Sequence, residues 1–240
     1  MFGRAVLTVV AVAGLALAPA NAADLPVKTP LYKAPPPVVA VFSWTGFYVG
    51  GFVGDIWTST TSSAFDAARV QATYGRVPAP RGAFGGLDLG YNWQMPNNVV
   101  IGVEVELDGL GLAAISDTAG IPGFSTVAAR VNWAVNVGAK LGYAFNRALP
   151  YVMVGPTWAH TNVAGANPFI GAFTLSNTHA GWFVAAGLEY ALIDNWTVRA
   201  QYRYAEYEKR PYNAVSLGAH ASAIMLGVNY RFGGPVVAKF

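Results

Sequence analysis

The sequence predicts an all-β protein, an eight-stranded antiparallel up-and-down transmembrane β-barrel. Three observations indicate this fold. Eight segments alternate between apolar residues and small, polar or charged ones, the connections between them alternate in length, and 54% of the residues are hydrophobic while only 11% are charged. Globular chains carry about 25% charged residues. A barrel whose apolar face contacts lipid needs far fewer, because much of its surface never meets water.

The N-terminus predicts export. A short basic start precedes a run of 14 residues, Ala5–Ala18, in which Thr8 is the only polar side chain. The small residues that follow predict a signal peptide over 1–22, cleaved between Ala22 and Ala23. The alternative, a membrane anchor, is disfavoured because a spanning helix needs about 20 apolar residues.

A linker is expected between the signal peptide and the barrel. Residues 23–43 contain five prolines and two lysines, a composition typical of an extended, flexible spacer. On the periplasmic side of an outer membrane, such a linker is a candidate contact for peptidoglycan. The β-barrel domain is then expected over 44–240.

The first half of the barrel is expected to contain four strands. Glycines blur the alternation in 46–57, but it is clear in 82–93 and 99–110; the latter carries Val, Ile and Leu on one face and mainly Gly, Glu and Asp on the other. In 127–145 one face is wholly apolar from residue 129 onward, and the other is small, polar or basic. Side chains on a strand point alternately to opposite sides, so each segment predicts a strand with two unlike neighbours.

The second half repeats the pattern in four more segments. Pro156 interrupts the alternation in 150–160, but 179–192 and 196–208 alternate regularly. The last segment, 220–232, carries Ile, Leu, Val, Tyr and Phe on one face and small or polar residues with Arg231 on the other. The chain is therefore expected to cross the membrane eight times.

The connections alternate between short and long. The short ones are 95–98, 146–149 and 193–195, and the long ones are 58–81, 111–126, 161–178 and 209–219. Outer-membrane barrels have short periplasmic turns and longer extracellular loops. The termini and short turns are therefore expected in the periplasm, and the long connections at the cell surface.

Aromatic residues predict which face contacts lipid. Many of them flank the short connections, where amphipathic rings would lie at the membrane interface. Trp133 and Tyr143 share one face ten residues apart, which corresponds to about 25 Å of height and matches the apolar band of a barrel. The predicted aromatic girdle is Trp93, Trp133, Tyr143, Trp182, Tyr190, Trp196, Tyr230 and Phe232.

Charged residues opposite the apolar face predict an ion-pair network in the lumen. Five acids and five bases are present there, and an unpaired buried charge is costly. A barrel of eight strands is just wide enough for its inward side chains to fill, which predicts a packed lumen. Hairpin geometry predicts Glu189 beside Arg199, while Lys140 and Arg231 are expected to pair with the acids of the second and third strands. The predicted network is Asp88, Glu104, Glu106, Asp108, Arg130, Lys140, Glu189, Arg199, Arg203 and Arg231.

Several ordered motifs resemble a known family. They are "ADLPVK" after the signal, "WTGFYVGG" at 44–51, "GYNWQ" at 90–94, "VIGVEVELDGLG" at 100–111, "KLGYAFNRALPYVMVG" at 140–155, "AGLEYALIDNWTVRAQYRY" at 186–204 and "GVNYRFG" at 227–233. In these the chain resembles the alphaproteobacterial outer-membrane immunogenic protein family of porin-like β-barrels. The resemblance implies an eight-stranded outer-membrane barrel with surface-exposed loops, a largely structural role and no catalytic residues.

Other chemistry is not predicted. The net charge of +3 is scattered and forms no basic run, so nucleic acid is not an expected partner. The absence of cysteine excludes disulfides and zinc–thiolate sites. His160, His179 and His220 lie on separate strands without ligand spacing, so neither a metal site nor a cofactor is expected.

The function expected from these features is structural, with surface loops that act as antigens, in the outer membrane of a Gram-negative bacterium. A small-pore porin or transporter is the first alternative, and a lipid-modifying enzyme, for which no motif is present, is the second. Expected partners are outer-membrane lipid, lipopolysaccharide and the barrel-assembly machinery, which would read the aromatic end of the last strand at Phe232 or Phe240.

Overall fold

The computed structural model describes residues 42–109, 115–121, 125–169, 171–193, 195–212 and 215–232. These residues form nine β-strands and one α-helix. No helix in the described ranges is long and apolar enough to cross a membrane. The expected signal peptide, its cleavage site at Ala22 and Ala23, and nearly all of the expected linker lie outside the described residues, so they stay predictions.

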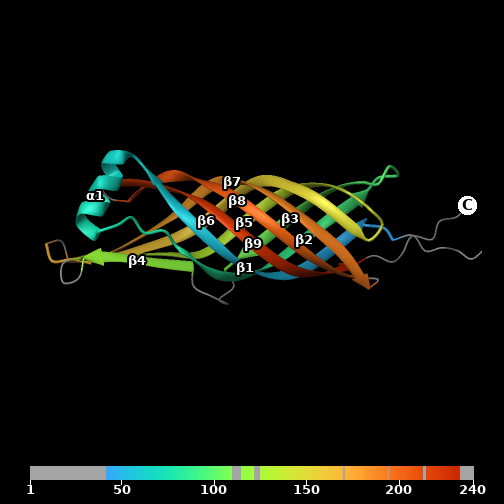
Figure 1. Cartoon of the computed structure of the whole chain (residues 1–240), viewed down its shortest axis with the longest axis horizontal. Coiled ribbons are helices and arrows are strands. Elements are labelled where there is room, and N and C mark those ends of the chain that lie inside the picture. Colours follow the sequence, from blue (N-terminus) through green and yellow to red (C-terminus); the bar gives the residue numbers. More distant parts are fainter. Residues whose placement is uncertain are drawn as a thin grey trace, which may run out of the picture. The chain divides into compact units, whose positions relative to one another are not determined.

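Eight of the strands form a closed antiparallel ring (Figure 1). The ring runs in the order β1-β9-β8-β7-β6-β5-β3-β2 and closes where β2 pairs with β1. Closure gives the backbone groups of the wall partners within the sheet, as lipid requires. The strands are β1 (Gly46–Ser62), β2 (Arg81–Gln94), β3 (Val99–Asp108), β5 (Ser125–Tyr143), β6 (Ala148–Asn167), β7 (Gly171–Ile193), β8 (Trp196–Tyr212) and β9 (Val215–Phe232). The prediction of an eight-stranded up-and-down barrel is confirmed.

A ninth strand, β4 (Ile115–Ile121), continues the wall beyond the end of β3. β5 pairs with β3 through residues 134–143 and with β4 through residues 125–131. The two strands thus occupy one place in the ring in succession. The sequence predicted a loop here, because a strand in this position lies beyond the lipid band and needs no continuous apolar face.

The helix α1 (Ala64–Tyr74) lies at the same end of the barrel as β4 (Figure 1). The Asp66 N–H donates to the Ser63 hydroxyl at 3.0 Å, which caps the helix N-terminus, and Gly75 ends the helix with φ of 76°. This segment was predicted to be a loop, and that prediction is wrong. Its Ser63 and Asp66 form a recognisable helix start, which a pattern of alternating apolar and polar residues does not reveal.

The hairpin of β6 and β7 is longer than expected. The two strands pair from Ala148 opposite Tyr190 to Asn167 opposite Gly171. Most of the connection expected at 161–178 is therefore strand. The sequence did not indicate this extension, because beyond the lipid band the alternation of apolar and polar residues becomes irregular.

The apolar face of the barrel lies outside. Outward side chains such as Val103 and Leu226 are both 62% exposed, whereas inward side chains such as Glu106 and Asn229 are 0% exposed. An ordinary core would have the opposite arrangement. This distribution fits a wall surrounded by lipid, with its polar residues inside.

A β-bulge in β5 changes which residues of that strand face the lumen. The pairing of β5 with β6 shifts between Val131 and Trp133, so an extra residue interrupts the alternation there. On the Tyr143 side of the bulge the even residues from 134 to 140 are buried. On the Ser125 side the odd residues turn inward, with Ser125 and Val127 buried and Ala129 and Val131 half-buried. Arg130 was predicted to lie in the lumen; it is exposed and faces outward.

Aromatic side chains gather at two levels of the wall. Near the short turns, Trp196 packs against Tyr230 with ring centroids 5.1 Å apart. Toward α1, Trp133 stacks on His160 at 5.6 Å. Of the predicted girdle, Tyr230 is half-buried and the other seven are exposed, namely Trp93, Trp133, Tyr143, Trp182, Tyr190, Trp196 and Phe232.

Candidate functional site in the barrel lumen

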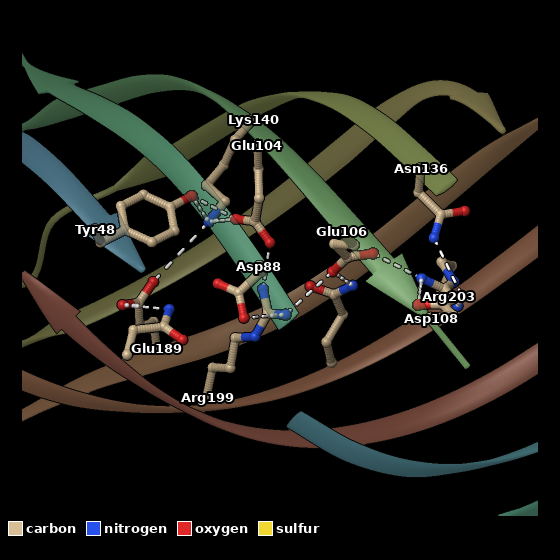
Figure 2. Close-up of polar contacts among 12 residues, drawn as sticks. Tyr48, Asp88, Glu104, Glu106, Asp108, Asn136, Lys140, Glu189, Arg199 and Arg203 are labelled. Atoms are coloured by element: carbon tan, nitrogen blue, oxygen red, sulfur yellow. Dashed lines mark hydrogen bonds and ion pairs between the residues drawn. The ribbon is translucent and has the colours of Figure 1, made fainter. Parts of the chain in front are cut away.

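Nine of the ten residues predicted for the ionic network point into the lumen, and all nine are at most 6% exposed. They come from six strands, because inward positions recur at every second residue of each strand. Figure 2 shows most of them meeting in the middle of the barrel. The nine are Asp88 on β2, Glu104, Glu106 and Asp108 on β3, Lys140 on β5, Glu189 on β7, Arg199 and Arg203 on β8, and Arg231 on β9.

Lys140 forms the part of the network nearest the short turns. Its Nζ pairs with Glu104 and donates to the Tyr48 hydroxyl at 2.9 Å, and that hydroxyl in turn donates to Glu104. The ammonium also lies 4.5 Å from the ring centroid of Tyr151. A buried lysine is thus held by a carboxylate, a hydroxyl and an aromatic face together.

Arg199 connects opposite sides of the barrel. Its guanidinium, carried by β8, pairs with Glu104 and approaches Glu106 at 3.2 Å on β3, and lies 3.3 Å from Asp88 on β2. The contact with Asp88 is close enough for an ion pair but is not aligned as a hydrogen bond. One arginine therefore faces three carboxylates (Figure 2).

Arg203 forms the part of the network nearest α1. Its Nη1 contacts Glu106 at 2.7 Å, and its Nη2 pairs with Asp108. Asn136 donates to Asp108 at 3.2 Å and accepts from the Thr157 hydroxyl at 2.7 Å. Arg–carboxylate contacts of this kind are strong, because both partners are charged and the guanidinium fork matches the carboxylate geometry.

The predicted ion pair between Glu189 and Arg199 does not form. Glu189 lies directly opposite Arg199 in the β7–β8 register, yet Arg199 reaches across the lumen to β2 and β3. Glu189 instead accepts from Thr197 and lies 4.0 Å from Lys140. The long guanidinium favours the far wall because three carboxylates gather there, against a single one beside it.

Arg231 is also placed differently from the prediction. Its guanidinium donates to the backbone carbonyls of Ser43 and Thr45 and lies 4.7 Å from the Phe42 ring centroid. Among the described residues it makes no ion pair. It therefore fastens the segment that enters β1 to the end of β9, outside the central network.

Uncharged residues that the sequence analysis did not single out complete the site. Gln201 donates to Glu106 at 2.9 Å and accepts from the Tyr151 hydroxyl at 2.6 Å. Tyr48 and Tyr151 lie over glycines of the neighbouring strands, and a Cβ on Gly90 or Gly187 would overlap them. The sequence could indicate Gln201, Tyr48 and Tyr151 only by their positions, because all three lie on the lumen face of their strands.

Some buried polar atoms have no hydrogen-bond partner in the described part of the chain. They include both carboxylate oxygens of Asp88 as hydrogen-bond acceptors, Oε2 of Glu189 and both side-chain amide atoms of Asn92. Five lumen acids face three cations in the central network, because Arg130 lies outside and Arg231 binds carbonyls. The network therefore has more negative than positive groups, and its excess lies around Asp88 and Glu189.

The closed ring, the outward apolar face and the inward polar residues define a transmembrane β-barrel of the outer-membrane type. Residues 8–232 match the family model described as "Outer membrane protein beta-barrel domain". The chain belongs to that family, and its place is the outer membrane.

Relatives support this membership over most of the chain. A 31 kDa outer-membrane immunogenic protein of Brucella melitensis is 34% identical, covering 89% of this chain and 93% of the relative. A 22 kDa outer membrane protein of Rhizobium leguminosarum bv. viciae is 29% identical, covering 82% of each. These relatives confirm the predicted alphaproteobacterial outer-membrane protein family.

Among solved structures, Neisserial surface protein A is 18% identical with a TM-score of 0.46, covering 78% of this chain and 98% of that one.

Proposed function

We propose that this protein is a structural component of the outer membrane whose lumen is closed by ion pairs and whose long connections are exposed at the cell surface. The observation that carries the proposal is the contact of Arg199 with carboxylates of the opposite wall. A side chain that spans a narrow barrel leaves little room for solutes. The alternative, a small-pore transporter, would require these contacts to open.

Single-channel recording on the purified barrel in planar bilayers tests the closed lumen. The expected result is no steady conductance, or only brief small events, because buried, paired side chains fill the centre of the barrel. A triple variant, Arg199→Ala with Glu104→Ala and Glu106→Ala, should conduct more than the native chain, and an outward variant, Leu226→Ala, should not. Steady conductance of the native barrel comparable to that of a general porin would contradict the proposal.

The proposed orientation places α1, β4 and the β6–β7 hairpin outside the cell and the short turns in the periplasm. The arrangement of long and short connections supports it, and the immunogenic relatives named above suggest that these exposed segments act as antigens. Cysteine labelling on intact cells tests it. Phe65→Cys on α1 should react with a membrane-impermeant maleimide, whereas Asn97→Cys in a short turn should not. If only Asn97→Cys were labelled, the orientation of the barrel would be the opposite of the one proposed.

The proposal also includes the signal peptide, with a mature chain starting at Ala23, which mass spectrometry of the outer-membrane protein would establish. It includes no catalytic step, because ion pairs occupy the buried acids Glu104, Glu106 and Asp108.

Outer-membrane lipid and lipopolysaccharide are the partners that we propose for the wall. Arg81 on β2 and Arg130 on β5 are exposed and flank the same position of β4, so their backbones are about 10 Å apart. Two outward cations beyond the lipid band suit lipid phosphates. Native mass spectrometry with added lipid A should show less bound lipid for Arg81→Gln with Arg130→Gln, and equal binding would remove the assignment. The barrel-assembly machinery and peptidoglycan stay predictions.

A further inference from the structure

Between the ionic network and α1, the lumen contains a cavity of about 510 Å³. Inward residues of β1, β5, β6, β7, β8 and β9 line it, and α1 contributes Val70 and Tyr74. Asp108, the last member of the network on β3, lies at its floor. The barrel wall, the helix and the ion pairs below therefore border the space, which is partly open.

Most of the lining is aliphatic or aromatic. Val131 on β5, Val163 on β6, Leu175 on β7 and Leu217 on β9 are among the lining residues. A water-filled mouth of a barrel would be lined mainly by polar residues. This part of the lumen thus differs in chemistry from the network beneath it.

Four polar side chains of the lining direct their hydrogen bonds into the protein. The Thr58 hydroxyl donates to the Pro80 carbonyl at 2.5 Å, and the Thr60 hydroxyl donates to the Pro78 carbonyl. The Thr73 hydroxyl donates to the Arg69 carbonyl at 2.9 Å, and Asp108 is occupied by Arg203. These groups leave little hydrogen-bonding capacity for a bound molecule.

The β-bulge in β5 is what makes this wall apolar. Regular alternation would bring Arg130 and other even residues into the cavity, whereas the bulge places Ala129 and Val131 there. Bulges commonly redirect side chains next to functional sites. Here the redirected side chains are apolar, and the arginine is moved to the outer surface.

We propose that this cavity is a binding site for a small, neutral, apolar molecule, aliphatic or aromatic. Its volume falls in the range of about 300–1,000 Å³ typical of small-molecule pockets. A charged ligand would lose its hydration, and the guanidinium of the lining, Arg69, is already engaged, since it lies over the Phe65 ring 5.6 Å from its centroid. The ion pairs at the floor make the site a pocket with one closed end, so it binds the molecule without passing it through the barrel.

Methyl NMR of the full mature chain in lipid nanodiscs, with naphthalene as the probe, tests the proposal. Naphthalene also dissolves in lipid, so methyls on the outer wall such as Val103 and Val154 should shift in proportion to its concentration. The cavity methyls of Val127, Val131 and Val163 should instead show a shift that saturates. Cavity methyls that merely follow the outer-wall methyls in the native protein would overturn the proposal.

Matched variants locate the site. Ala219→Phe fills the cavity and should abolish the saturable shift, whereas Ala200→Phe, on the outward face of β8, should leave it unchanged. Val131→Thr keeps the volume and should weaken binding by adding an unpartnered hydroxyl. The charged probe 2-naphthalenesulfonate should give no saturable shift. Equal saturation by both probes, or an unaltered response in Ala219→Phe, would also overturn the assignment.

Discussion

Arg199 is the residue on which most lumen acids depend. It contacts Glu104, Glu106 and Asp88, and it is 2% exposed. Removing the guanidinium would leave the carboxylates buried without a compensating charge. Loss of one partner of a buried ion pair destabilises a fold strongly for this reason. At the residue scale, the lumen is therefore most sensitive to the loss of a cation.

We predict that Arg199→Met lowers the free energy of unfolding by about 3–5 kcal/mol. Denaturant unfolding from lipid vesicles, followed by tryptophan fluorescence, measures it. Arg130→Met is the matched control, and it should change stability by less than about 0.5 kcal/mol because Arg130 is exposed outside the network. A similar loss in both variants would contradict the assignment of the two arginines.

The outward face gives a second prediction at this scale. Val103 is 62% exposed near the middle of the wall, and Val99 lies on the same face of β3 beside a short turn. Val103→Arg should cost about 2–4 kcal/mol, and Val99→Arg about 0–1 kcal/mol, if lipid surrounds the wall. Unfolding from vesicles measures both, and equal costs would show that depth in the membrane is not the cause.

At the element scale, the segment after α1 is fastened to β4 by an ion pair. Arg76 donates to both carboxylate oxygens of Asp117, at 2.7 and 2.6 Å, and the Ala79 N–H donates to the same group at 2.8 Å. Burial alone would raise the pKa of Asp117, but the hydrogen bonds from Arg76 and Ala79 outweigh it and lower this pKa below its usual value. The ionised form is therefore the one that holds the segment.

This contact predicts a pH dependence for α1. A carboxylate whose pKa is lowered by folding stabilises the fold above its ordinary pKa of about 3.9, and the stabilisation is lost as pH falls through the lowered value. Hydrogen exchange of α1, corrected for the intrinsic rate, should show protection decreasing below about pH 4. Asp117→Asn should have lower protection at pH 6 and a weaker pH response. An unchanged pH response in that variant would exclude Asp117 as the cause.

The elements also show where sequence reasoning succeeds. Strands within the lipid band were predicted well, because one face must be apolar throughout while the other carries polar and charged residues as well. β4, α1 and the outer part of the β6–β7 hairpin were missed, because none of them must present such a face. The position of Arg130 was wrong for a related reason, since alternation alone does not reveal a bulge.

At the scale of the whole molecule, the closure of the ring was predictable from the sequence. The contacts that side chains make across the lumen were not. Strand number and antiparallel order follow from the alternating segments and connections. The register of Glu189 opposite Arg199 followed from the hairpin. The partners of Arg199 depend on which side chains meet across the lumen, and that requires the tilt of all the strands together.

The contact between Arg199 and Glu104 has a consequence for the order of folding. Their strands, β8 and β3, are four places apart in the ring in either direction, so hairpins that insert one by one cannot form it. The ion pairs of Arg199 can appear only when the ring closes at its last seam, between β1 and β9. Interactions absent from the transition state slow unfolding without speeding folding. The network should therefore lengthen the lifetime of the inserted barrel and leave its insertion rate almost unchanged.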